Sequence, residues 1–64
     1  MVIINGEAVN AAGQTVSGYL AAAGFYAANV VVERNEEILP RDQYDSAILA
    51  DDDRVEIVCF VGGG

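Results

Sequence analysis

The feature that most constrains the fold is segment 54–61, an apolar run that leads directly into three glycines. The pattern predicts a β-strand, and alternate side chains of a strand point to opposite faces. One face of this strand then carries Val55, Ile57, Cys59 and Val61, and the other carries Glu56, Val58 and Phe60. Because an apolar strand face must be buried against a second layer, the chain needs a sheet that another element covers.

The first third of the chain supplies a hairpin and a helix that can form these layers. Residues 1–4 and 7–10 read as strands, and Asn5-Gly6 between them is a strong hairpin signal. Thr15 is suited to cap a helix over 16–23, which Gly24 then ends. The apolar stripe of this helix consists of Val16, Leu20 and Ala23, with Tyr19 beside it.

The middle of the chain alternates short strands with polar turns. Residues 29–33 are rich in β-branched side chains and predict a strand, and a polar turn over 34–37 leads into a short strand at 38–39 that Pro40 restricts to a sheet edge. A short helical turn is expected near 42–44. Between 41 and 50 the expected buried anchors are Tyr44, Ile48 and Leu49, whereas Asp51-Asp52-Asp53 reads as a solvated turn.

This order of elements predicts an α+β fold. One main helix packed across a small mixed sheet of four to five strands buries all the apolar stripes, which is the β-grasp, ubiquitin-like arrangement. We expect residues 1–64 to form a single domain in which 62–64 are a flexible reactive tail. Glycine has no Cβ, so such a tail can thread a channel too narrow for other residues and present the carboxylate of Gly64.

The charge and composition exclude several functions. Ten acidic residues face three arginines, with no lysine and no histidine, for a net charge of -7. Such a surface repels nucleic acid and anionic membranes. Without histidine and with one cysteine, we expect no metal site and no catalytic residues, and therefore no enzyme. No signal peptide or membrane-spanning run is apparent, so we expect the protein to be cytoplasmic.

Four further residues near the C-terminal end bear on partner contact or on sulfur chemistry. Val58, Phe60 and Val61 are expected to form a partner-binding patch, although Phe60 could instead tuck under the loop 41–50. Cys59 could be a sulfur-handling thiol, but a mid-strand position among valine and isoleucine favours a core role. No basic residue lies near Cys59 in the sequence, which also favours the core role.

The chain resembles the ThiS family of thiamine sulfur-carrier proteins along its whole length. The resemblance rests on six segments, of which the terminal glycines on a final apolar strand are the most specific. The segments are Ile4-Asn5-Gly6-Glu7, Thr15-Val16 with Leu20, Val32-Glu33-Arg34-Asn35, Ile38-Leu39-Pro40-Arg41, Asp53-Arg54-Val55-Glu56-Ile57-Val58 and Phe60-Val61-Gly62-Gly63-Gly64. Family members often end in a Gly-Gly pair, and the third glycine is a variation on that tail.

The resemblance implies a carrier chemistry. A ThiF-type adenylyltransferase adenylates the carboxylate of Gly64, a sulfur donor such as a cysteine desulfurase converts the adenylate to a thiocarboxylate, and a ThiG-type thiazole synthase accepts the sulfur. Gly62 and Gly63 thread the partner's active site. The ATP and magnesium are used by the activating partner, and no cofactor is expected on this chain.

Three alternatives remain open from the sequence. The carrier could serve another pathway, such as molybdopterin or cysteine synthesis. The same activated glycine would also suit a ubiquitin-like modifier of protein lysines, and an inert interaction module would not use its glycines at all. Replacement of one carboxylate oxygen by sulfur would indicate a sulfur carrier, and formation of larger conjugates would indicate a protein modifier. No reaction would indicate the inert module.

Overall fold

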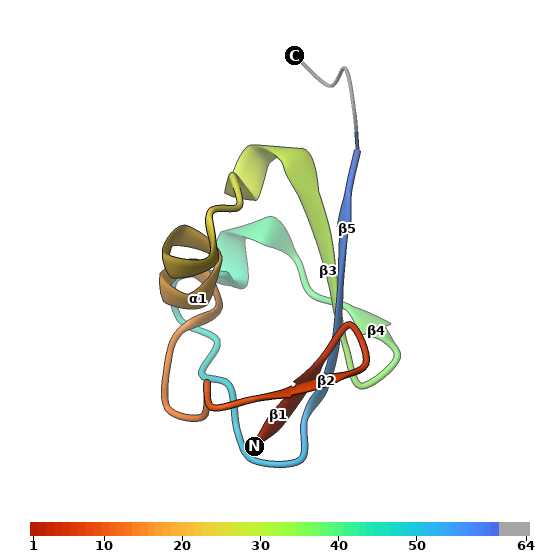
Figure 1. The fold of residues 1–64 in the computed structure, drawn as a ribbon. Coiled ribbons are helices and arrows are strands. Elements are labelled where there is room, and N and C mark those ends of the chain that lie inside the picture. Colours follow the sequence, from red (N-terminus) through yellow and green to blue (C-terminus); the bar gives the residue numbers. More distant parts are fainter. Residues whose placement is uncertain (61–64) are drawn as a thin grey trace.

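A computed structural model describes residues 1–60 of the chain; Val61, Gly62, Gly63 and Gly64 lie outside the described residues. Five strands form one sheet in the order β2-β1-β5-β3-β4. One α-helix and two 3-10 helices, η1 and η2, lie on one side of this sheet (Figure 1). The elements are β1 Val2–Ile4, β2 Glu7–Val9, α1 Val16–Ala23, η1 Ala27–Asn29, β3 Val30–Arg34, β4 Glu37–Ile38, η2 Arg41–Gln43 and β5 Arg54–Cys59.

The sheet is mixed, as the sequence predicts. Within residues 1–60 β1 and β5 run parallel, whereas β1 with β2, β3 with β4 and β3 with β5 are antiparallel. The predicted Asn5-Gly6 turn joins β1 to β2, and both of its residues have the positive φ (50° and 84°) that a type I′ hairpin needs. The expected α+β, β-grasp class is confirmed, with five strands and one α-helix in the described part of the chain.

The helix begins and ends where the sequence indicates. The Thr15 side chain accepts a hydrogen bond of 3.0 Å from the Gly18 amide, which satisfies one of the free donors of the first turn. Gly24 follows the helix with φ 87°, a left-handed conformation that residues with a Cβ rarely adopt. Tyr19 and Phe25 pack against the core from the helix side, whereas Tyr26 is exposed.

The core lies between α1 and the sheet face that α1 covers. Its buried apolar residues come from all layers of the fold, so the predicted stripes of strand and helix meet there. They are Val2, Ile4, Ala11, Val16, Leu20, Val30, Val32, Tyr44, Leu49, Val55 and Ile57. Tyr44 and Leu49 are thus buried as expected, and η2 lies where the short helical turn was predicted.

Three burial predictions outside β5 are wrong. Ile48 is 50% exposed, because it alternates with the buried Leu49 in an extended segment that bridges to Thr15. Ala23 is exposed at the last turn of α1, beyond the part of the helix that faces the sheet. Asp53 is buried, although Asp51 and Asp52 are exposed as predicted for a solvated turn.

No helix in residues 1–60 has the length and the apolar character needed to cross a membrane.

Candidate functional site: the distal end of strand β5

The central strand β5 connects the folded core to the segment that carries the predicted reactive end. It lies between β1 and β3 in the sheet, and its last residues reach the top of the molecule in Figure 1. Gly62, Gly63 and Gly64, and also Val61 of the predicted patch, lie outside the described residues. The described part of the candidate site is therefore the end of β5, Val58 and Cys59, together with Phe60 directly after the strand.

The proximal half of β5 is held from the β3 side by a carboxylate that the sequence did not mark. Asp53 precedes the strand, and its Oδ2 accepts hydrogen bonds from Arg34 Nε at 2.9 Å and from the Ala50 amide at 2.9 Å. Its Oδ1 accepts from Asn35 Nδ2 at 3.1 Å, while Arg34 Nη2 also donates to the Ile48 carbonyl at 2.7 Å. This network ties the start of β5 to β3 and to the preceding loop.

The same network sets the protonation of Asp53. Burial alone raises the pKa of its carboxyl, because it penalises the charged form. The hydrogen bonds from Ala50, Asn35 and Arg34, together with the positive charge of Arg34, outweigh that effect and lower the pKa below its ordinary value. Asp53 is therefore a charged, structurally engaged residue and not a candidate acid or base.

Two asparagines hold β5 through side-chain amides that imitate strand pairing. Asn35 Oδ1 accepts from the Arg54 amide at 2.9 Å on the β3 side. On the other side, Asn5 Oδ1 accepts from the Ile57 amide at 2.8 Å, and Asn5 Nδ2 donates to the Ile57 carbonyl at 3.3 Å. Both asparagines have positive φ (50° and 52°), a conformation that asparagine tolerates better than most residues.

The distal half of β5 lacks this support on one side. The pairing between β1 and β5 stops at Ile4 and Val55, and Asn5 extends it only to Ile57. Beyond that point β5 pairs with β3 alone, and the Phe60 amide donates to the Asn29 carbonyl at 3.0 Å. The edge of β5 next to Cys59 is consequently open within residues 1–60.

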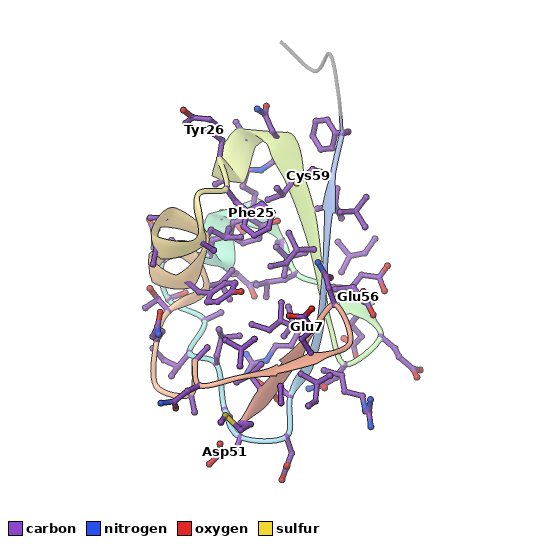
Figure 2. All side chains as sticks on the ribbon, viewed as in Figure 1. Glu7, Phe25, Tyr26, Asp51, Glu56 and Cys59 are labelled. Carbon is purple, nitrogen blue, oxygen red and sulfur yellow. The ribbon has the colours of Figure 1, made fainter. Side chains whose placement is uncertain are left out.

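Cys59 is exposed, so its predicted core role is wrong. It pairs with Val30 at the end of the sheet, and no strand lies on its other side in the described part of the chain. The alternation of β5 is as predicted up to Ile57, but the covering layers end before Cys59. The label in Figure 2 places Cys59 near the upper end of the strand.

Val58 and Phe60, two residues of the predicted partner-binding patch, are exposed to 57% and 41%. Phe60 is thus not enclosed by the loop 41–50. Among residues 1–60, no group of three potential metal-ligating side chains comes together. The described site therefore offers exposed apolar side chains and an open strand edge, which suit contact with another protein.

The sequence model of the ThiS family matches residues 2–64 of this chain. The crystal structure of a thiamine biosynthesis protein (ThiS) from Geobacter metallireducens superimposes with a TM-score of 0.78 at 36% identity, covering 98% of this chain and 97% of that one. The sulfur carrier protein ThiS of Bacillus subtilis is 54% identical over 35 residues, which are 55% of this chain and 53% of that protein.

A thiazole synthase of Magnetococcus marinus also contains a segment similar to this chain. The two are 45% identical over 62 residues, which are 95% of this chain but 19% of the synthase. The chain thus spans about a fifth of the length of the thiazole synthases that it matches.

Proposed function

The chain belongs to the ThiS family, and we propose that it is a sulfur carrier of thiamine biosynthesis whose reacting group is the carboxylate of Gly64. The single observation that carries the proposal is the family match over residues 2–64, which includes the three glycines that follow β5. The exposed distal end of β5 supports it, since a carrier must offer its reacting end to other proteins.

The proposed chemistry begins with activation of a poor acyl donor. The carboxylate at a chain end has a pKa of about 3.3–3.7, and the Gly64 carboxylate is therefore charged at neutral pH. Attack of this carboxylate on the α-phosphate of ATP forms an acyl-adenylate and releases pyrophosphate. Hydrosulfide then attacks the acyl carbon and displaces AMP, which leaves a thiocarboxylate on Gly64. Where the persulfide of a donor protein attacks instead, it displaces AMP to form an acyl disulfide, and a thiol then cleaves the S–S bond, releases the thiocarboxylate and is itself oxidised to a disulfide.

The partners of the proposed carrier supply the catalytic machinery. A ThiF-type adenylyltransferase would provide the ATP and magnesium site, because we assign no cofactor to this chain. A ThiG-type thiazole synthase would accept the sulfur and return the carboxylate. The similarity to a segment within thiazole synthases supports this second partner, since one polypeptide there joins a region like this chain to a synthase. A cysteine desulfurase is the proposed sulfur source.

Intact-mass measurement tests the proposal directly. The purified chain ending at Gly64 is incubated with a ThiF-type enzyme, ATP, magnesium and sulfide, and we expect the mass change of one oxygen replaced by one sulfur. The Bacillus subtilis carrier run in parallel shows that the enzyme is active. No change in this chain under those conditions would contradict the proposal, and larger lysine-linked conjugates in a cell extract would favour a protein modifier.

Variants of the tail locate the reaction. One alanine appended after Gly64, or a chain ended at Val61, should abolish adenylation while the melting temperature stays the same. Gly63→Val should reduce the rate strongly, because a branched side chain next to the reacting end obstructs a narrow channel. Adenylation of the extended chain at the rate of the original would overturn the assignment of Gly64.

The recipient is tested in a separate step. The thiocarboxylate form is mixed with a ThiG-type synthase and its other substrates, and loss of the sulfur with return of the original mass is expected. Retention of the sulfur with this synthase, but loss of it to a molybdopterin or cysteine pathway enzyme, would redirect the carrier to that pathway.

A further inference from the structure

The distal end of β5 is held in place by the end of β3 beside it. Within residues 1–60 the distal half of β5 is bonded on the β3 side alone, and its last backbone bond runs from the Phe60 amide to the Asn29 carbonyl at 3.0 Å. Asn29 is the last residue of η1, and Val30 begins β3 directly after it. Whatever fixes η1 and the start of β3 therefore also fixes the point from which the chain continues toward Gly64.

The other side of β3 has no strand beside this end in the described part of the chain. β4 pairs with the opposite end of β3, and the Leu39 amide then donates to the Val32 carbonyl at 2.9 Å. The next residue is Pro40, which has no N–H and cannot extend the ladder. Because the carbonyls of a strand alternate in direction, the next acceptor on this side is the Val30 carbonyl, and it needs a donor from elsewhere.

The side chain of Arg41 supplies that donor. Its Nη2 donates to the Val30 carbonyl and its Nε donates to the Ala27 carbonyl, both at 3.0 Å. One planar guanidinium thus joins the first residue of β3 to the first residue of η1, at the place where a neighbouring strand would otherwise bond. In Figure 1, η1 lies at the same end of the molecule as the end of β5.

The geometry of the Arg41 side chain matters here more than its charge. Both of its bonds go to neutral backbone carbonyls, whereas the side-chain ion pair of residues 1–60 is formed by Arg34 and Asp53. A guanidinium carries several N–H donors in a fixed plane, so it can hold two carbonyls at once in one arrangement. The carbonyls that Arg41 holds belong to residues on either side of Asn29, which receives the Phe60 amide.

We infer that Arg41 is a positioning residue for the proposed carrier reaction. It fixes η1 and the start of β3, and through the Asn29 carbonyl it fixes Phe60, after which the chain continues to Gly64. A partner enzyme then binds an end whose origin is already in place, and less conformational freedom is lost on binding. The inference rests on the proposed function, because the reaction at Gly64 is the one that Arg41 serves.

A direct contact between the Arg41 cation and the partner is the alternative that the test must separate from positioning. Arg41 is exposed, so its charge is accessible to a carboxylate of another protein. Lysine distinguishes the two roles, because it keeps the positive charge on a flexible stem but lacks the planar fork that holds two carbonyls. If Arg41 acts by position, Arg41→Lys should behave like Arg41→Met, which has no charge and no donor.

The first measurement is amide hydrogen exchange of the free protein, followed by NMR. The Phe60 amide of the original chain should be protected by its bond to Asn29. Arg41→Met and Arg41→Lys should both speed its exchange about tenfold, because the acceptor is no longer held from the other side. The Ile57 amide, which is bonded to the Asn5 side chain, should exchange as in the original.

Arg34→Lys is the matched control. It makes the same substitution at the far end of β3, where the arginine also donates to a backbone carbonyl, that of Ile48. This variant should lose stability but leave the exchange of the Phe60 amide unchanged.

The second measurement is the kinetics of adenylation by the ThiF-type enzyme. Arg41→Met and Arg41→Lys should each raise the KM for the carrier about five- to tenfold, because the enzyme must now order the backbone at Phe60. The kcat should stay the same, since Gly64 reacts normally once it is bound. Arg34→Lys should keep both parameters at a temperature at which circular dichroism shows all variants to be folded.

Each outcome decides between the inference and the proposed function. Unchanged exchange of the Phe60 amide in the Arg41 variants, or faster exchange with an unchanged KM, overturns the inference and leaves the carrier function standing. A KM that lysine restores and methionine does not would assign Arg41 to a direct charge contact, and an equal rise in Arg34→Lys would assign the effect to lost stability; both results also overturn it. Failure of the original chain to become adenylated, where the Bacillus subtilis carrier reacts, overturns the proposed function and the inference together.

Discussion

The two halves of strand β5 differ in how they are held. From Arg54 to Ile57 the strand is bonded on both sides, by β1 and Asn5 on one and by β3, Asn35 and Asp53 on the other. From Val58 to Phe60 it is bonded to the β3 side alone, and all its side chains there are exposed. The strand thus has an anchored half and an open half that is available for contact. A substitution in the anchored half should change the stability of the protein, and one in the open half should change partner binding.

The largest effect on the anchored half is expected for Asp53→Ala. This change removes the acceptor of Arg34, Asn35 and the Ala50 amide and leaves a partly buried arginine without its partner. Since Arg34 is not fully buried, we expect a loss of about 2–3 kcal/mol in the free energy of unfolding. Urea denaturation measures this, and a loss close to zero would show that the network does not hold the strand.

Asn5→Gly should have a smaller effect on the same half. Glycine accepts the positive φ of Asn5 but loses both bonds to Ile57, so we expect about 1–2 kcal/mol of destabilisation. Glu36→Gly is the control, because Glu36 also has a positive φ (70°) in a hairpin turn. Equal destabilisation by both variants would attribute the effect to the flexibility of glycine and not to the amide pairing.

The anchored half should also weaken in acid. Asp53 has a lowered pKa in the folded protein, so its contribution is present above the unfolded value of about 3.9 and is lost as pH falls toward the folded value. The difference in unfolding free energy between the original chain and Asp53→Asn should therefore shrink below about pH 4. A difference that stays constant from neutral to acid pH would contradict this role of Asp53.

The smallest effect is expected on the open half, for Cys59→Ser. The side chain is exposed, so the free energy of unfolding should change by less than about 0.5 kcal/mol. The variant should also become a thiocarboxylate at the rate of the original, because the proposed reacting atom is on Gly64. Loss of sulfur acceptance by the folded variant would mean that the thiol takes part in the chemistry.

Local sequence signals were sufficient for most of the fold. The hairpin was predicted from the Asn5-Gly6 turn, and the helix from the Thr15 cap and Gly24. These signals are readable because a turn or a cap depends on residues that are neighbours in the sequence. The burial of Ile48, Asp53 and Cys59 was predicted wrongly for another reason. The burial of these residues depends on where the covering elements end and on contacts with residues far away in the sequence. The alternation of side chains within one segment gives no information on either.

The candidate site was predictable to a similar, limited extent. The exposed apolar positions Val58 and Phe60 follow from alternation along β5. The open edge next to Cys59 does not, because it depends on where the pairing of β5 with β1 and Asn5 ends, and these lie far away in the sequence. The Asn5 amide was also missed as a partner of β5, although an asparagine in a tight turn beside a strand is the kind of signal that could suggest it.

The amide of Asn5 determines where the sheet stops along β5. A neighbouring strand can leave only if its hairpin opens, whereas an amide can release its partner by rotation about side-chain torsions. Rotation of the Asn5 amide would free the backbone of Ile57 on that side by breaking two hydrogen bonds, while Ile57 stays paired with Val32 of β3. The length of the open edge of β5 is in this sense set by the rotamer of one side chain.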